Sequence, residues 1–270
     1  MSSVTPPPNY DESFEAMLES SLDWWGLQGV DISKLITAKT AKPSAQAKVK
    51  PNTVRPKATS PSPTIEPKKD DAERVTIATK AAKDAKNLQS LKTAISSFDA
   101  GVLSDSATQI VFARGNEKAH LMIIGESPGI DEDAAGQPFI GKAGQLLDKM
   151  LATIGIDETS AYITNACYWR APGGRKPNKS ELAFCKPFIT RHIELIKPDY
   201  IILLGASALN LICDLNGITK HRGDWQNVTI GERDIKAIAM FHPAYLIKKP
   251  ELKKETWRDL LELHSQIKSD

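Results

Sequence analysis

From residue 120 onward the sequence alternates short apolar runs with segments of helical periodicity, and this alternation limits the fold more than any other feature. Strands that alternate with helices indicate a largely parallel sheet covered by helices on both faces. We therefore predict an α/β protein of three αβα layers around a central, mostly parallel four-stranded sheet. The predicted strands cover residues 120–124, 161–167, 200–204 and 235–240, and the predicted helices cover 72–98, 142–154, 179–196, 207–214 and 254–267.

The chain divides into three parts by composition. Residues 1–37 are acidic and carry apolar side chains at roughly helical spacing, which predicts a short amphipathic helix that either folds back on the domain or docks on a protein partner. Residues 38–72 are rich in Lys, Pro, Ala, Ser and Thr and hold too few apolar side chains to form a core, so we predict a disordered linker. Residues 73–270 form the predicted folded domain.

The overall composition narrows the class of protein. A formal net charge of +2 neither favours nor excludes nucleic acid as a partner, so any basic surface must be local. The 3 cysteines include no C-x-x-C pair, which is typical of reduced thiols and gives no metal site by spacing. The sequence shows no secretory signal and no apolar run long enough to span a membrane, so we expect a cytoplasmic protein.

Chemically active side chains follow the predicted strands at the points where these end. The loop after the first strand reads GESPGIDED at 125–133 and continues to GQPF at 136–139, the second strand holds Asn165, and the last strand precedes His242. Right-handed crossovers bring the loops at the carboxyl ends of parallel strands to one edge of the sheet. We therefore expect carboxylates, an amide, an imidazole and a phenyl ring to share one site.

These side chains suit one kind of chemistry better than others. An amide beside an aromatic ring can read and stack a flat heterocycle, and a carboxylate with a histidine suits the cleavage of a glycosidic bond. The sequence has no Walker A motif, no G-x-G-x-x-G and no Ser-His-Asp grouping supported by spacing. A P-loop enzyme or a dehydrogenase is therefore disfavoured, although the fold alone leaves open an unrelated nucleotide-binding protein.

Three segments in order resemble the motifs of a known family. GESPGIDED with GQPFIGKAG, then ITN, then HPAYL look like the uracil-DNA glycosylase superfamily, closest to its family 4, the iron–sulfur type. The resemblance covers about residues 91–263 and implies a monofunctional base-excision repair enzyme. Such an enzyme flips deoxyuridine out of DNA, hydrolyses the N-glycosidic bond and leaves an abasic site, acting as a monomer because one flipped base engages one pocket.

The resemblance also implies roles for particular residues. The catalytic assignments are Glu126 for electrostatic or water-positioning work, Glu132 as a second acidic candidate, and His242 as the donor to uracil O2; the substrate-binding assignments are Ser127, Phe139 for stacking and Asn165 for the imide edge. The candidate DNA contacts are Arg170, Arg175, Tyr245, Leu246 and Lys248, and Lys176 is a further candidate for a phosphate contact. Ser127 replaces the small residue usual in family 4, which leaves the base range open.

The sequence departs from family 4 at the iron–sulfur site. The resemblance implies four cysteine ligands, yet only Cys185 matches one of these positions, Trp169 stands at another, and the segment 96–103 has no cysteine. One thiolate cannot hold a cluster, so we predict that none is bound and that apolar packing fills its place. Two alternatives stay open at this point: a uracil or damaged-DNA binding protein with little turnover, and a glycosylase for another deaminated base such as hypoxanthine.

Overall fold

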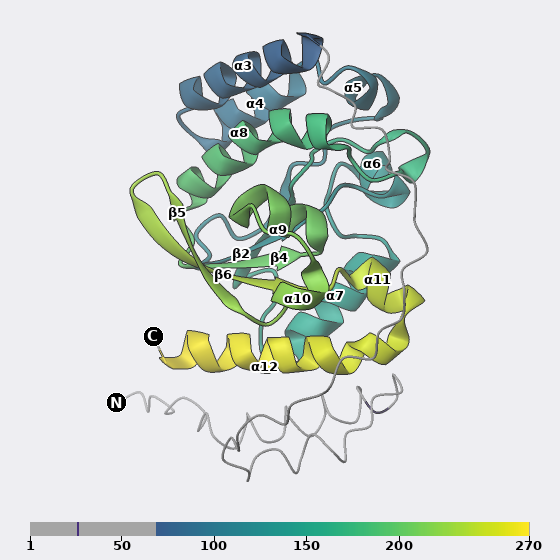
Figure 1. The fold of residues 1–270 in the computed structure, drawn as a ribbon, viewed down its shortest axis with the longest axis vertical. Coiled ribbons are helices and arrows are strands. Elements are labelled where there is room, and N and C mark those ends of the chain that lie inside the picture. Colours follow the sequence, from purple (N-terminus) through teal and green to yellow (C-terminus); the bar gives the residue numbers. More distant parts are fainter. Residues whose placement is uncertain (1–25, 27–68, 270) are drawn as a thin grey trace, which may run out of the picture.

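The computed structural model describes residue 26 and residues 69–269 (Figure 1). The predicted acidic segment 1–37 and the linker 38–72 therefore lie outside the described residues, apart from Gly26 and the start of the helix at Lys69. The folding-back or docking of the acidic segment stays a prediction. In the described part of the chain, no helix combines the length and the apolar character needed to cross a bilayer.

The centre of the molecule is a six-stranded sheet in the order β1-β3-β2-β4-β6-β5. The four inner strands are mutually parallel, and the two edge strands pair antiparallel to their neighbours. The strands are β1 Ala113–Gly115, β2 Leu121–Gly125, β3 Ala161–Asn165, β4 Tyr200–Leu204, β5 Trp225–Ile230 and β6 Arg233–Met240. The four parallel strands match the predicted ones in position. The predicted count of four was wrong because β1 and β5 lie at the edges and lack the continuous apolar runs of buried strands.

Helices cover both faces of this sheet, which confirms the three-layer prediction (Figure 1). One layer holds α3 Lys69–Asp84, α4 Leu88–Ser96, α5 Val102–Ser106, α8 Lys179–Ile196 and α9 Ala206–Cys213; the other holds α7 Lys142–Ala152, α11 Pro243–Lys248 and α12 Lys253–Ser269. Two short helices, α6 Ile130–Ala135 and α10 Ile218–His221, lie in the connections. Two 3-10 turns, Pro172–Gly174 and Pro250–Leu252, complete the described elements.

Alternation along the central strands builds two separate cores. In β2, Met122 and Ile124 pack against the layer of α8 and α9, whereas Leu121 and Ile123 pack against the layer of α7 and α12. Because successive side chains of a strand point to opposite faces, an uninterrupted apolar run is what a doubly covered strand requires. This rigid double packing fixes the carboxyl ends of the strands, where the loops of interest begin.

The predicted helix 72–98 is in fact two helices. The first ends at Asp84, and Asn87 then caps the second, with its side-chain oxygen accepting the Ser90 backbone N–H at 2.8 Å. An asparagine that caps a new helix competes with the continuation of the previous one, because its own backbone adopts an extended conformation. The break lets α3 and α4 both pack on α8.

Candidate active site

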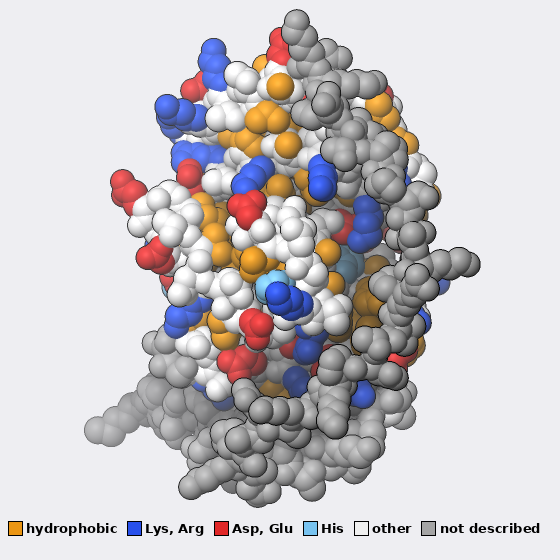
Figure 2. Space-filling view, in the orientation of Figure 1, with side chains coloured by type: hydrophobic (Ala, Val, Ile, Leu, Met, Phe, Trp, Pro, Cys, Tyr) orange, Lys and Arg blue, Asp and Glu red, His pale blue; other side chains and the backbone are white. Residues whose placement is uncertain are grey.

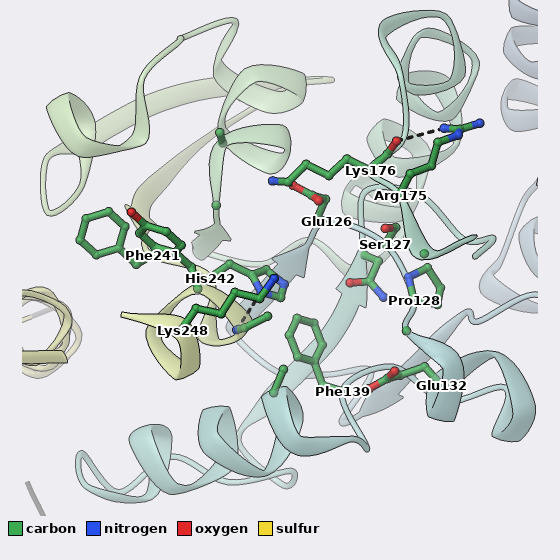
Figure 3. Close-up of a pocket in the computed structure, with 18 of the residues that line it drawn as sticks. Glu126, Ser127, Pro128, Glu132, Phe139, Arg175, Lys176, Phe241, His242 and Lys248 are labelled. Carbon is green, nitrogen blue, oxygen red and sulfur yellow. Dashed lines mark hydrogen bonds and ion pairs between the residues drawn. The ribbon is translucent and has the colours of Figure 1, made fainter. Parts of the chain in front are cut away.

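The loops after β2, β3, β4 and β6 enclose a pocket of about 480 Å³ at the carboxyl edge of the sheet (Figure 3). Most of the predicted site residues line it, which the right-handed parallel topology explains. These are Glu126, Ser127, Glu132, Phe139, Asn165, Arg175, His242, Tyr245 and Lys248. Lys176 and Phe241 also line the pocket.

Glu126 follows the last residue of β2, and its carboxylate is held on one side. Its Oε2 accepts hydrogen bonds from Lys176 Nζ at 2.8 Å and from Ser207 Oγ at 2.7 Å. Lys176 comes from the loop between β3 and α8, and Ser207 from the first turn of α9. The carboxylate therefore ties together the loops after three neighbouring strands.

Asn165 ends β3 and pairs in register with Gly125 at the end of β2. A Cβ at position 125 would lie 2.3 Å from Asn165 Oδ1 and 2.4 Å from Phe139 Cζ, closer than any real contact. Only glycine therefore lets the amide and the ring approach β2 together. The close approach places a hydrogen-bonding group and an apolar face side by side at the bottom of the pocket.

Phe139 lies between α6 and α7 in a backbone conformation that side chains rarely adopt, with φ at +56°. Arg114 on β1 holds this turn by donating from Nε to the Pro138 carbonyl at 3.0 Å and from Nη2 to the Phe139 carbonyl at 3.3 Å. The guanidinium also pairs with Asp148 and Glu158. A left-handed phenylalanine persists only where its surroundings fix it, so the ring is preorganised by the fold.

Glu132 supports the same turn. Its Oε1 accepts the backbone N–H of Gly141, the N-cap of α7, at 2.9 Å, and the residue is buried. The carboxylate therefore links α6 to the start of α7, on either side of Phe139. This engagement gives Glu132 a structural task beside the catalytic one predicted for it.

His242 is the N-cap of α11, directly after β6, and its imidazole stands over the pocket. Its Nδ1 accepts the Ala244 backbone N–H at 3.2 Å. Burial lowers the pKa of His242 to about 4, with the cation of Lys176 acting in the same sense and Glu126 and Glu132 opposing it. The ring is therefore neutral at pH 7, and because Nδ1 is an acceptor, the proton is assigned to Nε2.

A second layer of contacts holds the loop that carries His242. The guanidinium of Arg222 lies 5.6 Å from the ring centroid of Phe241 and donates from Nε to Asp259 Oδ2 of α12 at 3.0 Å. Phe241 in turn packs on Tyr245 of α11, with centroids 5.7 Å apart. The ion pair on α12 thus supports the strand-to-helix junction at His242.

The structure contradicts one of the predicted DNA contacts. Leu246 is wholly buried in the core beneath α11, so the prediction that it contacts DNA was wrong. The helical turn Pro243–Lys248 directs it inward and leaves Tyr245 and Ile247 exposed. Arg170 and Arg175 stay predictions. Arg170 does not line the pocket, whereas Arg175 lines it and donates to both carboxylate oxygens of Glu181 at 2.6 and 2.7 Å.

Fold and site together define a class of protein, an αβα sandwich whose strand-end pocket offers a stacking ring, an amide, a neutral imidazole and a carboxylate. The sequence profile described as "Uracil DNA glycosylase superfamily" matches residues 112–261, which is more than half of the chain. The chain belongs to the uracil-DNA glycosylase superfamily.

Relatives point to one branch of that superfamily. The chain is 38% identical over 158 residues to the type-4 uracil-DNA glycosylase of Archaeoglobus fulgidus, and the aligned region covers 57% of this chain and 79% of the relative. It is 38% identical over 170 residues to the type-4 uracil-DNA glycosylase of Thermotoga maritima, covering 60% and 85%. The corresponding protein of Pyrobaculum aerophilum is 34% identical over 179 residues, covering 64% and 91%. The chain is thus similar to type-4 enzymes over its folded domain.

The residues at the iron–sulfur position do not fit a cluster. Phe98 packs on Trp169, Phe184 and Phe188, with ring centroids 6.0, 5.6 and 5.1 Å apart. Cys185 lies buried among these rings, and burial together with the adjacent Cys167 raises the pKa of its thiol well above the usual value. Among the described residues, no three His, Cys, Asp or Glu side chains gather as metal ligands.

Proposed function

We propose that the protein is a monofunctional uracil-DNA glycosylase that hydrolyses the N-glycosidic bond of deoxyuridine in DNA, releasing uracil and leaving an abasic site. The observation that carries this proposal is the hydrogen bond from the Ala244 backbone N–H to His242 Nδ1, which assigns the ring proton to Nε2, where it can meet a substrate. Family membership and the type-4 relatives support the same activity. The reaction would take place in the cytoplasm, on a monomer that engages one flipped nucleotide.

The pocket can recognise uracil without reading the surrounding sequence. Phe139 offers its face to the base, and Asn165 can donate to O4 and accept from N3–H at the imide edge. At the same two positions cytosine has an amino donor on C4 and an acceptor at N3. An Asn165 amide in a fixed orientation would therefore place a donor against a donor and an acceptor against an acceptor. Recognition of the edge therefore favours uracil over the normal base.

Bond cleavage places opposite charges on the two products, and the pocket has a group for each. When the C1′–N1 bond breaks, its electron pair stays on uracil, and the negative charge spreads to O2, where Nε2–H of neutral His242 can donate. The sugar becomes cationic, and the Glu126 carboxylate can stabilise it and orient the water that adds to C1′. The proton lost by this water balances the uracil anion, so hydrolysis needs no other reactant.

DNA contacts at the rim would come from Lys248 and Tyr245, which are exposed beside the pocket. On the face seen in Figure 2, basic and acidic side chains are interspersed rather than gathered into one patch. We propose phosphate contacts at the pocket mouth, which position the protein without specifying sequence. We also propose that the domain folds and acts without an iron–sulfur cluster, since aromatic rings occupy the position.

A cleavage assay tests this function. A labelled oligonucleotide with one deoxyuridine is incubated with the full chain in the presence of a chelator and then split with hot alkali. We expect scission that depends on alkali, and no trapping of a covalent adduct by borohydride. Tight binding without scission would instead identify a binding protein, and scission at deoxyinosine alone would identify a glycosylase for hypoxanthine.

A further inference from the structure

The two oxygens of the Glu126 carboxylate differ in their hydrogen bonds, and this difference bears on the chemistry of the pocket. In the part of the chain that the structure describes, the two donors to this carboxylate are Lys176 Nζ and Ser207 Oγ, and both reach the same oxygen, Oε2. Among the described residues, none donates a hydrogen bond to Oε1. Pinning one oxygen from two sides fixes the plane of the carboxylate and leaves the other oxygen for a ligand in the pocket.

The segment that carries Lys176 is itself anchored. Arg175 and Asn178 lie on either side of Lys176, and both form hydrogen bonds to Glu181. The guanidinium of Arg175 donates to both carboxylate oxygens, and the Asn178 backbone N–H donates to Oε2 at 2.7 Å. Asn178 in return caps α8 through the Glu181 backbone N–H. The lysine backbone is therefore fixed, and its side chain spans the gap to Glu126 (Figure 3).

The ion pair between Lys176 and Glu126 contributes little to the stability of the fold. The Lys176 side chain is 72% exposed, whereas that of Glu126 is only 14% exposed. An ion pair with one end in solvent contributes little to the free energy of folding, because solvent screens it and holding the long side chain costs entropy. What such a pair can do is orient the buried partner.

We propose that Lys176 and Ser207 are positioning residues, which hold Oε2 of Glu126 so that Oε1 faces the sugar and the attacking water. This assignment rests on the proposed glycosylase function. It differs from the role expected for an exposed lysine at the mouth of a DNA-binding pocket, which is a phosphate contact. The two roles have different kinetic signatures, because positioning acts on the chemical step and a phosphate contact acts on salt-dependent binding.

The experiment compares Lys176→Met, Lys176→Arg and Ser207→Ala with the wild-type chain, and uses Lys248→Met as a matched lysine control. The single-turnover rate is measured at saturating enzyme on an oligonucleotide with one deoxyuridine. The dissociation constant is measured across a salt series on the same oligonucleotide carrying 2′-fluorodeoxyuridine, whose fluorine disfavours the cationic sugar. Each lost phosphate contact lowers the salt slope by about 0.9 on a duplex.

We expect Lys176→Met to lower the single-turnover rate by about 10- to 100-fold with the salt slope unchanged, and Lys176→Arg to restore most of the rate. Ser207→Ala should lower the rate in the same way, and Lys248→Met should lower the salt slope. In a Glu126→Gln background, Lys176→Met should have little further effect, because it acts through the carboxylate.

A reduced salt slope in Lys176→Met, with or without a loss of rate, would overturn the assignment, as would additive losses in the Glu126→Gln background. An inactive wild-type protein would instead reject the glycosylase function itself, so the two failures are distinguishable.

Discussion

The rings of Phe139 and His242 lie nearly parallel across the pocket, with centroids 5.6 Å apart and planes inclined by 29°. This distance is too short for a flat base to lie between the two rings, so a base that stacks on Phe139 has to use the part of the phenyl face that the imidazole leaves open. A flat base stacked on that open part would have its edge beside the imidazole. The relationship thus fixes the two functions of the pocket, stacking and donation, in one arrangement.

The first prediction concerns pH. The pKa of His242 lies at about 4, below its ordinary value of 6.5, so the neutral ring persists as pH falls through 6.5 and is lost only near pH 4. We expect the part of kcat/KM that depends on His242 to be constant from pH 6.5 down to about pH 4 and to decrease at lower pH, where the ring becomes protonated. A pH profile of wild type and His242→Ala measures this, with the variant reduced by about 10²- to 10³-fold. An inflection near 6.5 that disappears in His242→Ala would contradict it.

The second prediction concerns base selection. Asn165→Ala removes both hydrogen bonds to the imide edge, and the loss of such bonds in a buried site corresponds to about 10- to 100-fold in kcat/KM. The preference for uracil over cytosine should fall in parallel. Cleavage of matched oligonucleotides with deoxyuridine or deoxycytidine tests both effects. Undiminished discrimination would show that another group reads the base.

The third prediction concerns the strained turn at Phe139. Arg114→Met removes the donors to the Pro138 and Phe139 carbonyls, and we expect a loss of about 1–3 kcal/mol of stability and a rise in KM. Denaturant unfolding and steady-state kinetics measure these changes. Glu158→Gln is the matched control, since it alters the outer ion pair of Arg114 and leaves its bonds to the turn. Equal effects of the two variants would mean that charge pairing, not the clamp on the turn, is responsible.

The fourth prediction separates two neighbours on α11. Leu246→Ala opens a cavity in the core and should destabilise the domain by about 2–5 kcal/mol. Tyr245→Ala removes a half-exposed side chain that packs on Phe241, and it should cost at most about 0.5–1.5 kcal/mol of stability while weakening DNA binding. Thermal unfolding and binding to a deoxyuridine oligonucleotide distinguish them. If Tyr245→Ala left DNA binding intact, Tyr245 would not be a DNA contact, and Lys248 would remain the candidate on α11.

The fifth prediction concerns the aromatic cluster of Phe98, Trp169, Phe184 and Phe188. The purified protein should be colourless, without the absorbance near about 400 nm of an iron–sulfur cluster, and should release no stoichiometric iron. Trp169→Ala should destabilise it by about 3–5 kcal/mol, because the indole is buried. Metal analysis of protein prepared without oxygen makes the first test decisive, since a cluster found there would refute the proposal.

The sequence predicted the layered fold because its inner strands are continuous apolar runs, and a run such as 121–124 has few alternatives to a doubly covered strand. It missed β1 and β5, whose side chains are partly exposed. The pairing of β1 also depends on β3, a strand distant in sequence, whereas β5 forms a hairpin with β6. The prediction of one unbroken helix over 72–98 was wrong for a local reason. Asn87 caps a second helix, but the prediction gave more weight to the helical periodicity of the segments on either side of it.

The site likewise contains residues that could be predicted from the sequence and contacts that could not. Asn165 and His242 could be predicted because strand ends converge by topology alone. The engagement of Lys176 with Glu126, and of Arg114 with the turn at Phe139, joins positions far apart in the chain and leaves no trace in local pattern. Leu246 was misplaced because the resemblance supplied a loop, whereas the residues after Pro243 form a helical turn that directs this side chain inward.

The order of the chain sets when the pocket can exist. During synthesis β2 and the Glu126 that follows it leave the ribosome before the other strands that lead into the pocket, and β6, which precedes His242, leaves last of these. On the proposed mechanism, a nascent or clipped chain that lacks β6 has no His242 to donate to the departing base. Such a chain also lacks an inner strand of the sheet, so we expect incomplete copies to add few stray abasic sites to the genome.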